Sequence, residues 1–382
     1  MVDLFEKTFV DKFFPNQAIF SFWKGRVALY AILRALEITE DDEIILPGYT
    51  CVVVPNTIRF TRAKMRFVDN APGTYHINPE LIESNISKRT RAIVIQHTYG
   101  IPGPVEEVRA ISEKYNLPVI EDCAHSLGSS FNGTLVGNWG MAAFFSSQWS
   151  KPFTTGLGGL AVTSDPEFGK KIEKIYSSMT EPTSSARRKL NLQYFIYKNF
   201  YSPRIYWQAQ KMLHVLSKIG LFVGSSTDSE LEGNDPLDHN WRMSFQQKKD
   251  GYKSLVAIEE NFKHRDALVK FYDEVLGENG WPIAYRTGKT NFLRYPILVR
   301  NKEELLVKAR QDRVELGSWF ETPLHPAPLD KHYIFGYWPG QCPVAEETTQ
   351  QVVNLPMHRW VTEKEAERTV NFFIKNATMI EK

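Results

Sequence analysis

The sequence predicts an α/β protein with two domains: a large domain with a mainly parallel sheet between helices over residues 1–245, and a smaller α+β domain over residues 246–382. In the first half of the chain, short β-branched runs alternate with amphipathic stretches, which is the pattern of βαβ units. After Phe245, helical patterns mix with isolated strands such as LRYPILVRN. A chain of 382 residues, 42% of them hydrophobic, is long enough to fill both cores.

The predicted elements of the large domain follow one another in a regular order. A helix, RVALYAILRALEI, follows Gly25; the strand EIILP, the helix VVVPNTIRFT and the strand KMRFVDN, which ends on Asp69, come next. Asn78 and Pro79 predict a helix start, because asparagine caps helices well and the first turn does not need the N–H that proline lacks. The runs RAIVIQHTYG, PVEEVRAISEKYN and LPVIEDCAH continue as strand, helix and strand, and AAFFSSQ and GGLAVTSD add two strands. The sheet should therefore have at least six strands.

A basic, aromatic-rich insertion from about Tyr176 to Pro236 interrupts this order. Its first part predicts amphipathic helices, and the polar run SSTDSELEGND predicts a loop. One interpretation is that the lysines and aromatic rings contact a membrane surface or a partner helix. Helices packed on the body of the protein or on a dimer mate are favoured, since the apolar stripe of a helix usually faces a core.

Charge and cysteine content narrow the class of partner. The 46 basic and 44 acidic side chains give a formal net charge of +2, which provides no overall attraction to nucleic acid or to an anionic membrane. Cys51, Cys123 and Cys342 are scattered, so they predict neither a disulfide framework nor a metal site. The N-terminus lacks the apolar region of a signal peptide, and no run is long enough to span a membrane. We expect a cytoplasmic protein.

Lys151 stands between a serine-rich and a glycine-rich run in FFSSQWSKPFTTGLGG. The glycines do not predict a nucleotide loop, because a strand pattern follows them where a phosphate loop would need a helix. A lysine that bonds to a carbonyl must lose its proton, although its ordinary pKa is about 10.4. Trp149, Pro152 and Phe153 could desolvate it, and the glycines could let the backbone pass close to a flat cofactor. Alternatively, Lys151 is a loop lysine whose amine reaches solvent.

A second group of polar residues ends a predicted strand in VIEDCAHSLGS. Carboxylates at the carboxyl end of a parallel strand lie in the crevice where α/β sheets bind ligands. Asp122 could there keep a pyridine nitrogen protonated, which makes pyridoxal 5′-phosphate (PLP) an electron sink. His125 could reach the phenolic oxygen of that ring or pack on its face. Helix capping is the alternative role for Asp122, and also for Asn240 in the segment HNWRMS.

Taken in order, these segments resemble the DegT/DnrJ/EryC1/StrS family of PLP-dependent sugar aminotransferases. The resemblance covers nearly the whole chain except the insertion, and it rests on GRVALYAIL, DDEIILPGYTC, MRFVDN, IVIQHTYGIPGP, VIEDCAHSLGS, AAFFSSQWSKPFTTGLGGLAVTSD, HNWRMS, TPLHPAP and VNLPMH. Each motif is short, but their order and spacing together are specific. The resemblance implies fold type I of the PLP-dependent transferases, the aspartate aminotransferase-like fold.

Carried over residue by residue, the resemblance assigns roles to five positions. It implies that Lys151 bonds covalently to PLP, that Asp122 pairs with the pyridine nitrogen and that His125 lies beside the ring. Ser146 would hold the phosphate. Asn240 matches an asparagine that reaches the phosphate of the neighbouring subunit's cofactor, which implies a homodimer with shared active sites.

Two positions around the cofactor depart from the family pattern. The family has Gly-Thr near the start of its first large-domain helix, with the threonine and the backbone amides on the phosphate, whereas this chain has Gly25 and Arg26. Arginine can hold a phosphate through paired hydrogen bonds. Cys51 stands where the family has an aromatic ring stacked on PLP, so any stacking would come from Tyr49 or His125.

The family also implies a reaction. Members with histidine in place of the lysine dehydrate deoxysugars, so Lys151 implies transamination. We expect the enzyme to move the amino group of L-glutamate to a nucleotide-linked keto-sugar, with ping-pong kinetics. The product would enter the synthesis of lipopolysaccharide, another surface polysaccharide or a secondary metabolite. The alternatives are an aminotransferase for a free keto-sugar acid, a non-catalytic PLP-binding regulatory protein, and a scaffold that acts through the insertion.

Overall fold

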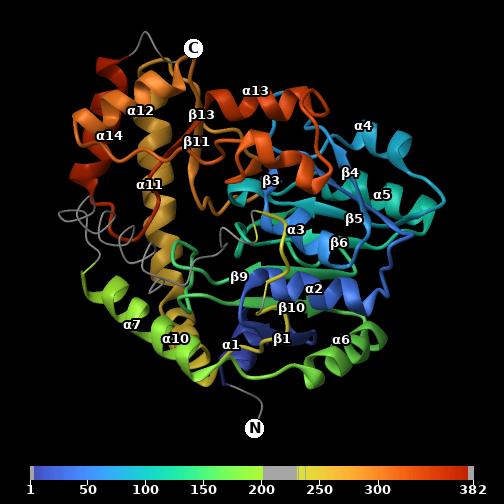
Figure 1. The fold of residues 1–382 in the computed structure, drawn as a ribbon. Coiled ribbons are helices and arrows are strands. Elements are labelled where there is room, and N and C mark those ends of the chain that lie inside the picture. Colours follow the sequence, from blue (N-terminus) through green and yellow to red (C-terminus); the bar gives the residue numbers. More distant parts are fainter. Residues whose placement is uncertain (1–3, 201–229, 231, 237, 377–382) are drawn as a thin grey trace.

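The computed structural model describes residues 4–200, 230, 232–236 and 238–376, and its centre is a seven-stranded sheet in the order β1-β10-β9-β6-β5-β2-β4 (Figure 1). Its strands are β1 (Ala18–Phe22), β2 (Glu43–Pro47), β4 (Lys64–Val68), β5 (Thr90–Gln96), β6 (Val119–Asp122), β9 (Ala142–Ser146) and β10 (Gly159–Thr163). The five strands from β9 to β4 are mutually parallel, while β10 is antiparallel to both β9 and β1. The predicted mainly parallel sheet is confirmed; β1 is a strand that the sequence did not indicate.

Helices cover both faces of the sheet because its buried strands alternate their side chains between two cores. Ile44 and Leu46 of β2 belong to one core, and Ile45 belongs to the other. The first core also holds side chains of α2 and α6, and the second holds those of α4 and α5. These helices, with α3, are α2 (Gly25–Ala35), α3 (Val53–Phe60), α4 (Pro79–Ile82), α5 (Val105–Tyr115) and α6 (Pro166–Ser178). The Asn78 side chain caps α4, as predicted.

The N-terminal helix α1 (Leu4–Phe13) covers the part of the sheet that carries β9 and β10. Its Phe5 and Phe9 are fully buried one helical turn apart, and the Phe9 ring contacts those of Phe145 and Phe153 at 5.4 and 5.7 Å between centroids. Helix α10 (Phe245–Val256) packs beside α1 and is capped by Ser244, whose side chain forms a capping box with Gln247. The alternation of charges and phenylalanines at the N-terminus is thus that of an amphipathic helix.

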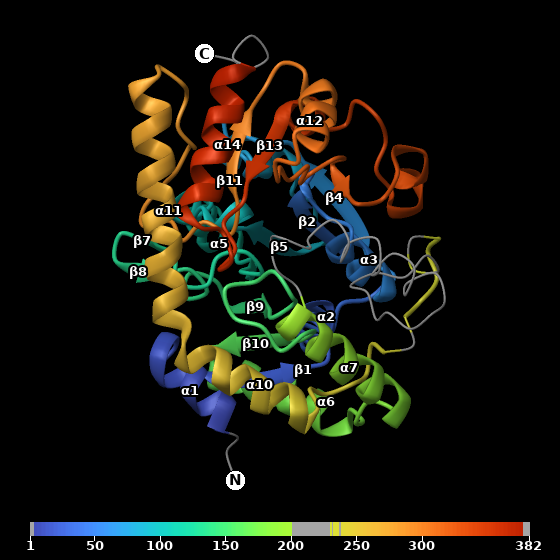
Figure 2. The same cartoon turned by 90° about the vertical axis from the view of Figure 1, so that its left-hand side faces the viewer.

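The C-terminal part contains a two-stranded antiparallel sheet flanked by helices (Figure 2). Its elements are α11 (Ile258–Glu278), β11 (Tyr295–Leu298), α12 (Lys302–Gln311), η4 (Leu329–Phe335), α13 (Pro343–Gln351), β13 (Val352–Leu355) and α14 (Glu363–Lys375). A short parallel pair, β3 (Thr50–Cys51) with β12 (Leu324–His325), ties this part to the segment that follows β2. The domain boundary between residues 245 and 246 stays a prediction.

The first half of the insertion lies on the body of the protein. After α6, helix α7 (Ser184–Phe200) packs through Leu190 against Trp23 and Leu157, and it lies beside α10 in both ribbon views (Figures 1 and 2). The helices and loop expected over residues 201–229 lie outside the described residues. Within the described ranges, none of the helices combines the length and apolarity needed to cross a bilayer.

Two further hairpin strands complete the list of elements near the sheet. The pair β7 (Ser130–Phe131) and β8 (Thr134–Leu135) forms a small antiparallel ribbon after β6.

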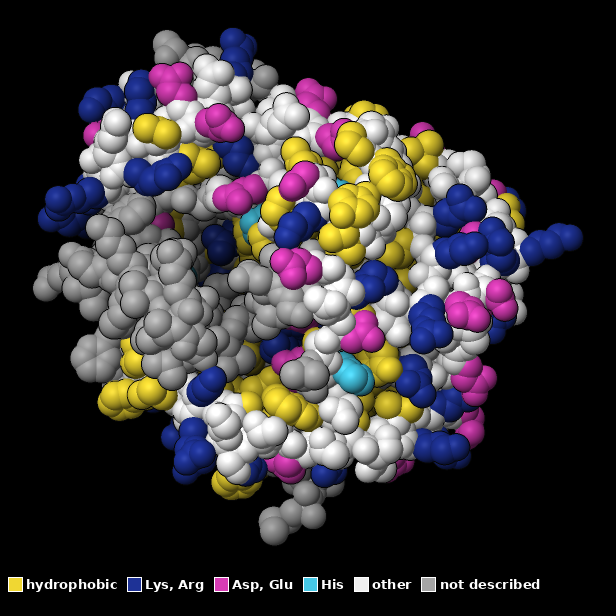
Figure 3. Space-filling model, in the orientation of Figure 1, with side chains coloured by type: hydrophobic (Ala, Val, Ile, Leu, Met, Phe, Trp, Pro, Cys, Tyr) yellow, Lys and Arg dark blue, Asp and Glu magenta, His cyan; other side chains and the backbone are white. Residues whose placement is uncertain are grey.

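On the face of the molecule in Figure 3, acidic and basic side chains are interspersed, in keeping with the net charge of +2.

Candidate functional site

A pocket of about 220 Å³ lies at the carboxyl ends of β6 and β9, where the sequence predicted a ligand crevice. Seven of the eight predicted site residues line it: Gly25, Arg26, Cys51, Asp122, His125, Ser146 and Lys151. Asn240 does not; its side chain is exposed, and its carbonyl accepts a hydrogen bond from the Thr180 N–H at 3.0 Å. A larger cavity, about 370 Å³, lies between α7, α10 and α11 and contains none of the predicted residues.

Lys151 lies at the tip of the reversal between β9 and β10. Its N–H donates to the Gln148 carbonyl at 2.9 Å, and the Ser147 N–H donates to the Gly158 carbonyl at 3.0 Å, so the turn is fixed by its own backbone bonds. The side chain is buried, which contradicts the alternative of a solvent-reaching loop lysine. Burial lowers the pKa of Lys151 from 10.5 to about 7, against the opposing charge of Asp122. A neutral amine, as covalent chemistry requires, is therefore accessible near neutral pH.

Asp122 is the last residue of β6 and is buried beside that amine. Its Oδ1 accepts the Ala124 N–H at 2.9 Å, which makes a local turn and not the cap of a helix. Burial raises the pKa of Asp122 to about 6, although Lys151 and His97 favour the ionised form. At neutral pH Asp122 is therefore mainly ionised, and the carboxylate is the form that keeps a pyridine nitrogen protonated.

His125 is neutral and its proton position follows from one hydrogen bond. Burial lowers the pKa of His125 well below 6.5, with Lys151 and Arg294 acting in the same direction. Its Nδ1 accepts the Tyr99 N–H at 3.2 Å, so the proton must lie on Nε2. The imidazole thus presents a donor on its other edge.

The start of α2 reaches the pocket because β10 carries glycine where the two elements meet. A Cβ on Gly159 would lie 2.5 Å from the Lys24 carbonyl oxygen and would overlap Gly25 Cα, and a Cβ on Gly25 would lie 3.2 Å from that of Ser146. Gly158 leaves room for the hydroxyls of Ser147 and Thr155. Contacts within the protein thus favour glycine at positions 158 and 159, and Gly158 also lines the pocket; the interpretation that the glycines make space for a flat cofactor stays a prediction.

Two buried cations flank Gly25 at this helix N-terminus. Lys24 Nζ pairs with Asp238 Oδ2 at 2.6 Å, and Arg26 Nη1 pairs with Glu230 Oε1. Arg26 Nη2 is buried and has no hydrogen-bond partner among the described residues. A helix N-terminus with nearby cations is a natural anion site, because its first amide groups point outward and the helix dipole favours negative charge.

The sequence missed several residues that line the pocket. They include Trp319 and His325 from the C-terminal part, Gln96 from β5 and Lys24. His325 lies in the motif TPLHPAP, to which no role was assigned, whereas Trp319 had no signal in the sequence. Tyr49, proposed as a stacking ring, is instead fully buried in the core, where its hydroxyl lies 2.6 Å from that of Tyr99. Cys51 and His125 remain beside the pocket.

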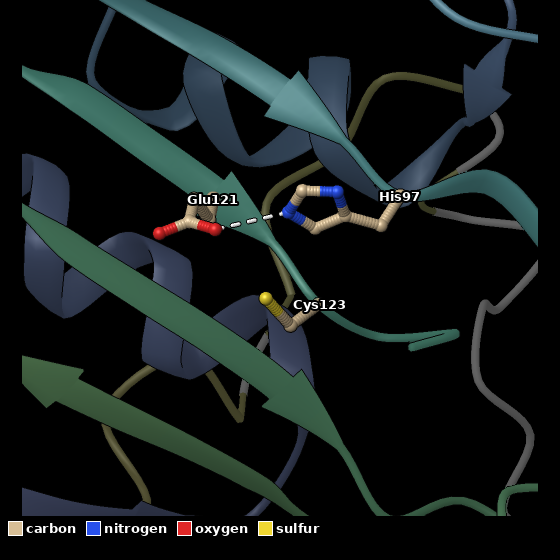
Figure 4. Close-up of side chains that lie close together, drawn as sticks. All are labelled: His97, Glu121 and Cys123. Carbon is tan, nitrogen blue, oxygen red and sulfur yellow. Dashed lines mark hydrogen bonds and ion pairs between the residues drawn. The ribbon is translucent and has the colours of Figure 1, made fainter. Parts of the chain in front are cut away.

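Beside the pocket, His97, Glu121 and Cys123 gather in a geometry that could suggest a metal ion (Figure 4). His97 Nδ1 accepts the Gly103 N–H at 2.9 Å, so its Nε2 donates to Glu121 at 3.0 Å. The Glu121 oxygens also accept, each at 2.7 Å, the N–H groups of Gly137, Trp139 and Gly140. Since hydrogen bonds already use the histidine and carboxylate atoms, the cluster is a structural network that ties residues 137–140 to β6.

The pocket residues fit PLP. Asp122 matches a protonated pyridine nitrogen, and the Nε2 donor of His125 suits a phenolate oxygen. The start of α2 suits a phosphate together with Arg26 Nη2, for which the described part of the chain offers no hydrogen-bond partner. Lys151 supplies the deprotonated amine.

Comparison with known proteins leads to the same family. A model of the DegT/DnrJ/EryC1/StrS aminotransferase family matches residues 1–373. An uncharacterised protein of Methanocaldococcus jannaschii is 29% identical over 353 residues, 90% of this chain and 81% of that protein. GDP-perosamine synthase of Caulobacter vibrioides is 26% identical over 375 residues, 96% of this chain and 87% of that enzyme. GDP-perosamine synthase of Escherichia coli O157:H7 is 41% identical over a shorter 141 residues, 37% of this chain and 39% of that enzyme.

Solved structures confirm the fold. The crystal structure of DesV from S. venezuelae, in complex with a ketimine intermediate, has a TM-score of 0.75 and 20% identity, with coverage of 99% of this chain and 89% of that one. The family match and the pocket together lead to one conclusion: this chain belongs to the DegT/DnrJ/EryC1/StrS aminotransferase family and is a PLP-dependent transaminase of fold type I.

Proposed function

We propose that this transaminase moves the amino group of L-glutamate to the carbonyl carbon of a nucleotide-linked keto-sugar. The observation that carries the proposal is the buried amine of Lys151, whose pKa is lowered to about 7, in one pocket with Asp122. Full-length similarity to the GDP-perosamine synthase of Caulobacter vibrioides supports a nucleotide-linked sugar as the acceptor.

The side chains of the pocket divide the work around the cofactor. When bound, PLP supplies an electron sink for the carbanion formed at the amino donor. Asp122 would hold the pyridine nitrogen, and Arg26 with Ser146 and the N-terminus of α2 would hold the phosphate. His125 would donate from Nε2 to the phenolic oxygen, with its ring orientation fixed by the Tyr99 N–H.

Lys151 would move the proton. Its neutral Nζ accepts the proton from the donor's Cα, and the ammonium so formed can return a proton on the other side of the transfer, as a general base and then a general acid. A pKa of about 7 suits both roles, because neither form of the amine is rare near neutral pH. In the second half-reaction Lys151 performs the same steps in reverse at the carbon that becomes the amine-bearing carbon of the sugar.

The same proposal extends to assembly and cellular context. We place the enzyme in the cytoplasm, in the synthesis of lipopolysaccharide or another amino-sugar polymer; the free thiols Cys51, Cys123 and Cys342 suit a reducing compartment. It acts as a homodimer in which Asn240 serves the partner's cofactor phosphate. The exposure of Asn240, outside the pocket of its own chain, supports that role.

The test of the reaction uses purified protein with added PLP. Wild type and a Lys170→Ala control, changed at an exposed lysine of α6, should show the absorbance band of lysine-linked PLP, lose it on addition of L-glutamate and release 2-oxoglutarate. Lys151→Ala should lack that band. Subsequent addition of a nucleotide-linked keto-sugar should restore the band in wild type, whereas a free keto-sugar acid should not. A wild type without the band, or Lys151→Ala with an unchanged one, would refute the assignment.

The test of shared sites uses co-expressed, differently tagged Lys151→Ala and Asn240→Ala subunits. Each homodimer should be inactive or nearly so. If Asn240 serves the partner's site, the hybrid dimer has one site with both changes and one intact site, so it should recover up to half of wild-type activity. A hybrid with no more activity than the two parents would show that each chain completes its own site.

A further inference from the structure

Trp319 is a half-buried ring of the loop between α12 and β12, and it contacts three functional groups at once. Its ring stacks on that of His125, with 5.1 Å between centroids and 22° between planes. Lys151 Nζ lies 5.3 Å from the ring centroid, and the Arg294 guanidinium lies 4.3 Å from it. Trp319 therefore forms a wall of the pocket beside the Lys151 amine and in contact with the His125 ring.

The backbone on both sides of Trp319 is held by a buried lysine. Lys302 Nζ donates to the carbonyls of Ser318, Phe320 and Thr349 at 3.3, 2.9 and 2.7 Å, which uses all three of its protons. Burial lowers the pKa of Lys302 to about 8. Each flanking peptide of Trp319 thus has a fixed position relative to α12.

Two more hydrogen bonds fix the Trp319 peptide itself. Its N–H donates to Asn354 Oδ1 at 3.0 Å, and its carbonyl accepts the Tyr99 hydroxyl at 2.6 Å. Tyr99 is also the residue whose N–H fixes the His125 ring, at 3.2 Å. The indole and the imidazole are therefore positioned from one common residue, and their stacking does not depend on the bound cofactor.

We propose that Trp319, held by Lys302, is a positioning residue that fixes the amine of Lys151 and the Nε2 donor of His125 and keeps water away from both. The proposal rests on the function proposed above, because it assigns the arrangement of the same site. An indole that stacks on one group and borders the other leaves neither free to rotate without opening a gap in the wall. An aliphatic side chain at position 319 would leave that gap open to solvent.

The consequence can be measured on the PLP-free protein, without any turnover. The titratable and charged groups that face Lys151 are Asp122 and Cys51, which favour its ammonium, and Arg294 and Arg265, which disfavour it. Burial is the largest influence on its pKa. If Trp319 excludes water, its removal must move the titration of Lys151 back toward the value of a hydrated lysine. A residue with a purely structural role elsewhere would leave that titration unchanged.

The experiment follows acetylation of Lys151 by acetic anhydride as a function of pH, with peptide mass spectrometry as the readout. In wild type, the midpoint should lie near pH 7. Trp319→Leu and Lys302→Met should each raise the midpoint by about one pH unit or more. Trp319→Phe should stay close to wild type, because a ring at this position can still stack. Lys308→Met, changed on the same helix but at a partly exposed lysine, is the matched control and should not move the midpoint.

The outcomes separate this proposal from the function on which it rests. A wild-type midpoint near 7 that Trp319→Leu and Lys302→Met leave in place would overturn the positioning role and spare the proposed function. A wild-type midpoint near 10.5 would also overturn the positioning role, because water would already reach the amine; the proposed function is decided separately by the absorbance band of lysine-linked PLP. Circular dichroism identifies folded variants; should Lys302→Met not fold, the pair Trp319→Leu and Trp319→Phe decides alone. In folded variants that support the proposal, kcat should fall at least tenfold for Trp319→Leu while the KM for glutamate changes much less.

Discussion

Replacement of Glu121 by glutamine should destabilise the fold more than any surface change, although the side chain keeps its shape. The Glu121 carboxylate is fully buried and accepts four hydrogen bonds, one from His97 Nε2 and three from backbone N–H groups. It therefore acts as an acceptor through both oxygens. These bonds hold residues 137–140 to the end of β6, next to Asp122.

The expected loss of stability follows from the number of donors that the Glu121 carboxylate satisfies. Glutamine keeps one oxygen, which can serve two of the four donors, and places its own N–H groups against the other two. A hydrogen bond to a charged group contributes about 1.5–3 kcal/mol, so the loss of two gives about 3–6 kcal/mol. Partial relaxation reduces that figure, and we expect a fall of about 3–5 kcal/mol in the free energy of unfolding, the range for breaking a buried charged pair.

Thermal unfolding followed by circular dichroism measures the effect, with an expected fall in melting temperature of roughly 5 °C for Glu121→Gln. The control is Glu113→Gln on α5, where an exposed pair with Arg109 at 2.9 Å is lost and the change should be about 0.5 kcal/mol or less. A Glu121→Gln protein as stable as that control would refute the reasoning, because it would mean that the donors are satisfied without the carboxylate.

Three more predictions concern the pocket. Arg26→Met should weaken PLP binding about tenfold or more. Glu230→Gln should tighten PLP binding at least about threefold, because the Glu230 carboxylate, which pairs with Arg26, would repel a phosphate beside it. Fluorescence titration measures both affinities, and unchanged values would exclude Arg26 from the phosphate site. Gly159→Ala should weaken PLP binding and lower the free energy of unfolding together, because its Cβ would collide with the start of α2. The control is Gly277→Ala in α11, where a Cβ meets open space; in urea unfolding it should be neutral or stabilising by about 0.5–1 kcal/mol. Burial lowers the pKa of Lys151 from 10.5 to about 7, so between pH 7 and pH 10.5 the unfolded chain binds more protons than the folded one. The free energy of unfolding of the PLP-free protein should therefore rise with pH over this range, and Lys151→Met should flatten that rise. Urea midpoints that change with pH in parallel for the two proteins would contradict this prediction.

The elements predicted from the sequence are those whose signals are local. Strands such as β2 and β5 and the helices between them carry their own periodicity, and the cap at Asn78 acts within four residues. The strand β1 was missed because AIFSF is short and its pairing partner, β10, lies far along the chain. Residues 201–229 of the insertion remain a prediction.

The residues of the site likewise divide into those that the sequence predicted and those that it did not. Asp122, Ser146 and Lys151 belong to β6, β9 and the turn that follows, so the parallel order of the sheet was enough to bring them together. Trp319 could not be predicted, because its place depends on Lys302 and Asn354, which are remote in sequence from one another and from the sheet. The close approach of Gly159 to the start of α2 was missed for a similar cause, since that neighbour is visible only in three dimensions.

The position of β1 at the edge of the sheet has a consequence for synthesis on the ribosome. Ala18 pairs with Thr163 and Phe22 pairs with Gly159, so this N-terminal strand leaves the ribosome early and waits until both β9 and the Lys151 turn have been made. Until then, the phenylalanines of α1 have no core to cover, and they are an exposed apolar surface of the kind that chaperones bind. Completion of the catalytic turn and burial of the α1 phenylalanines are thus coupled in the biogenesis of this enzyme.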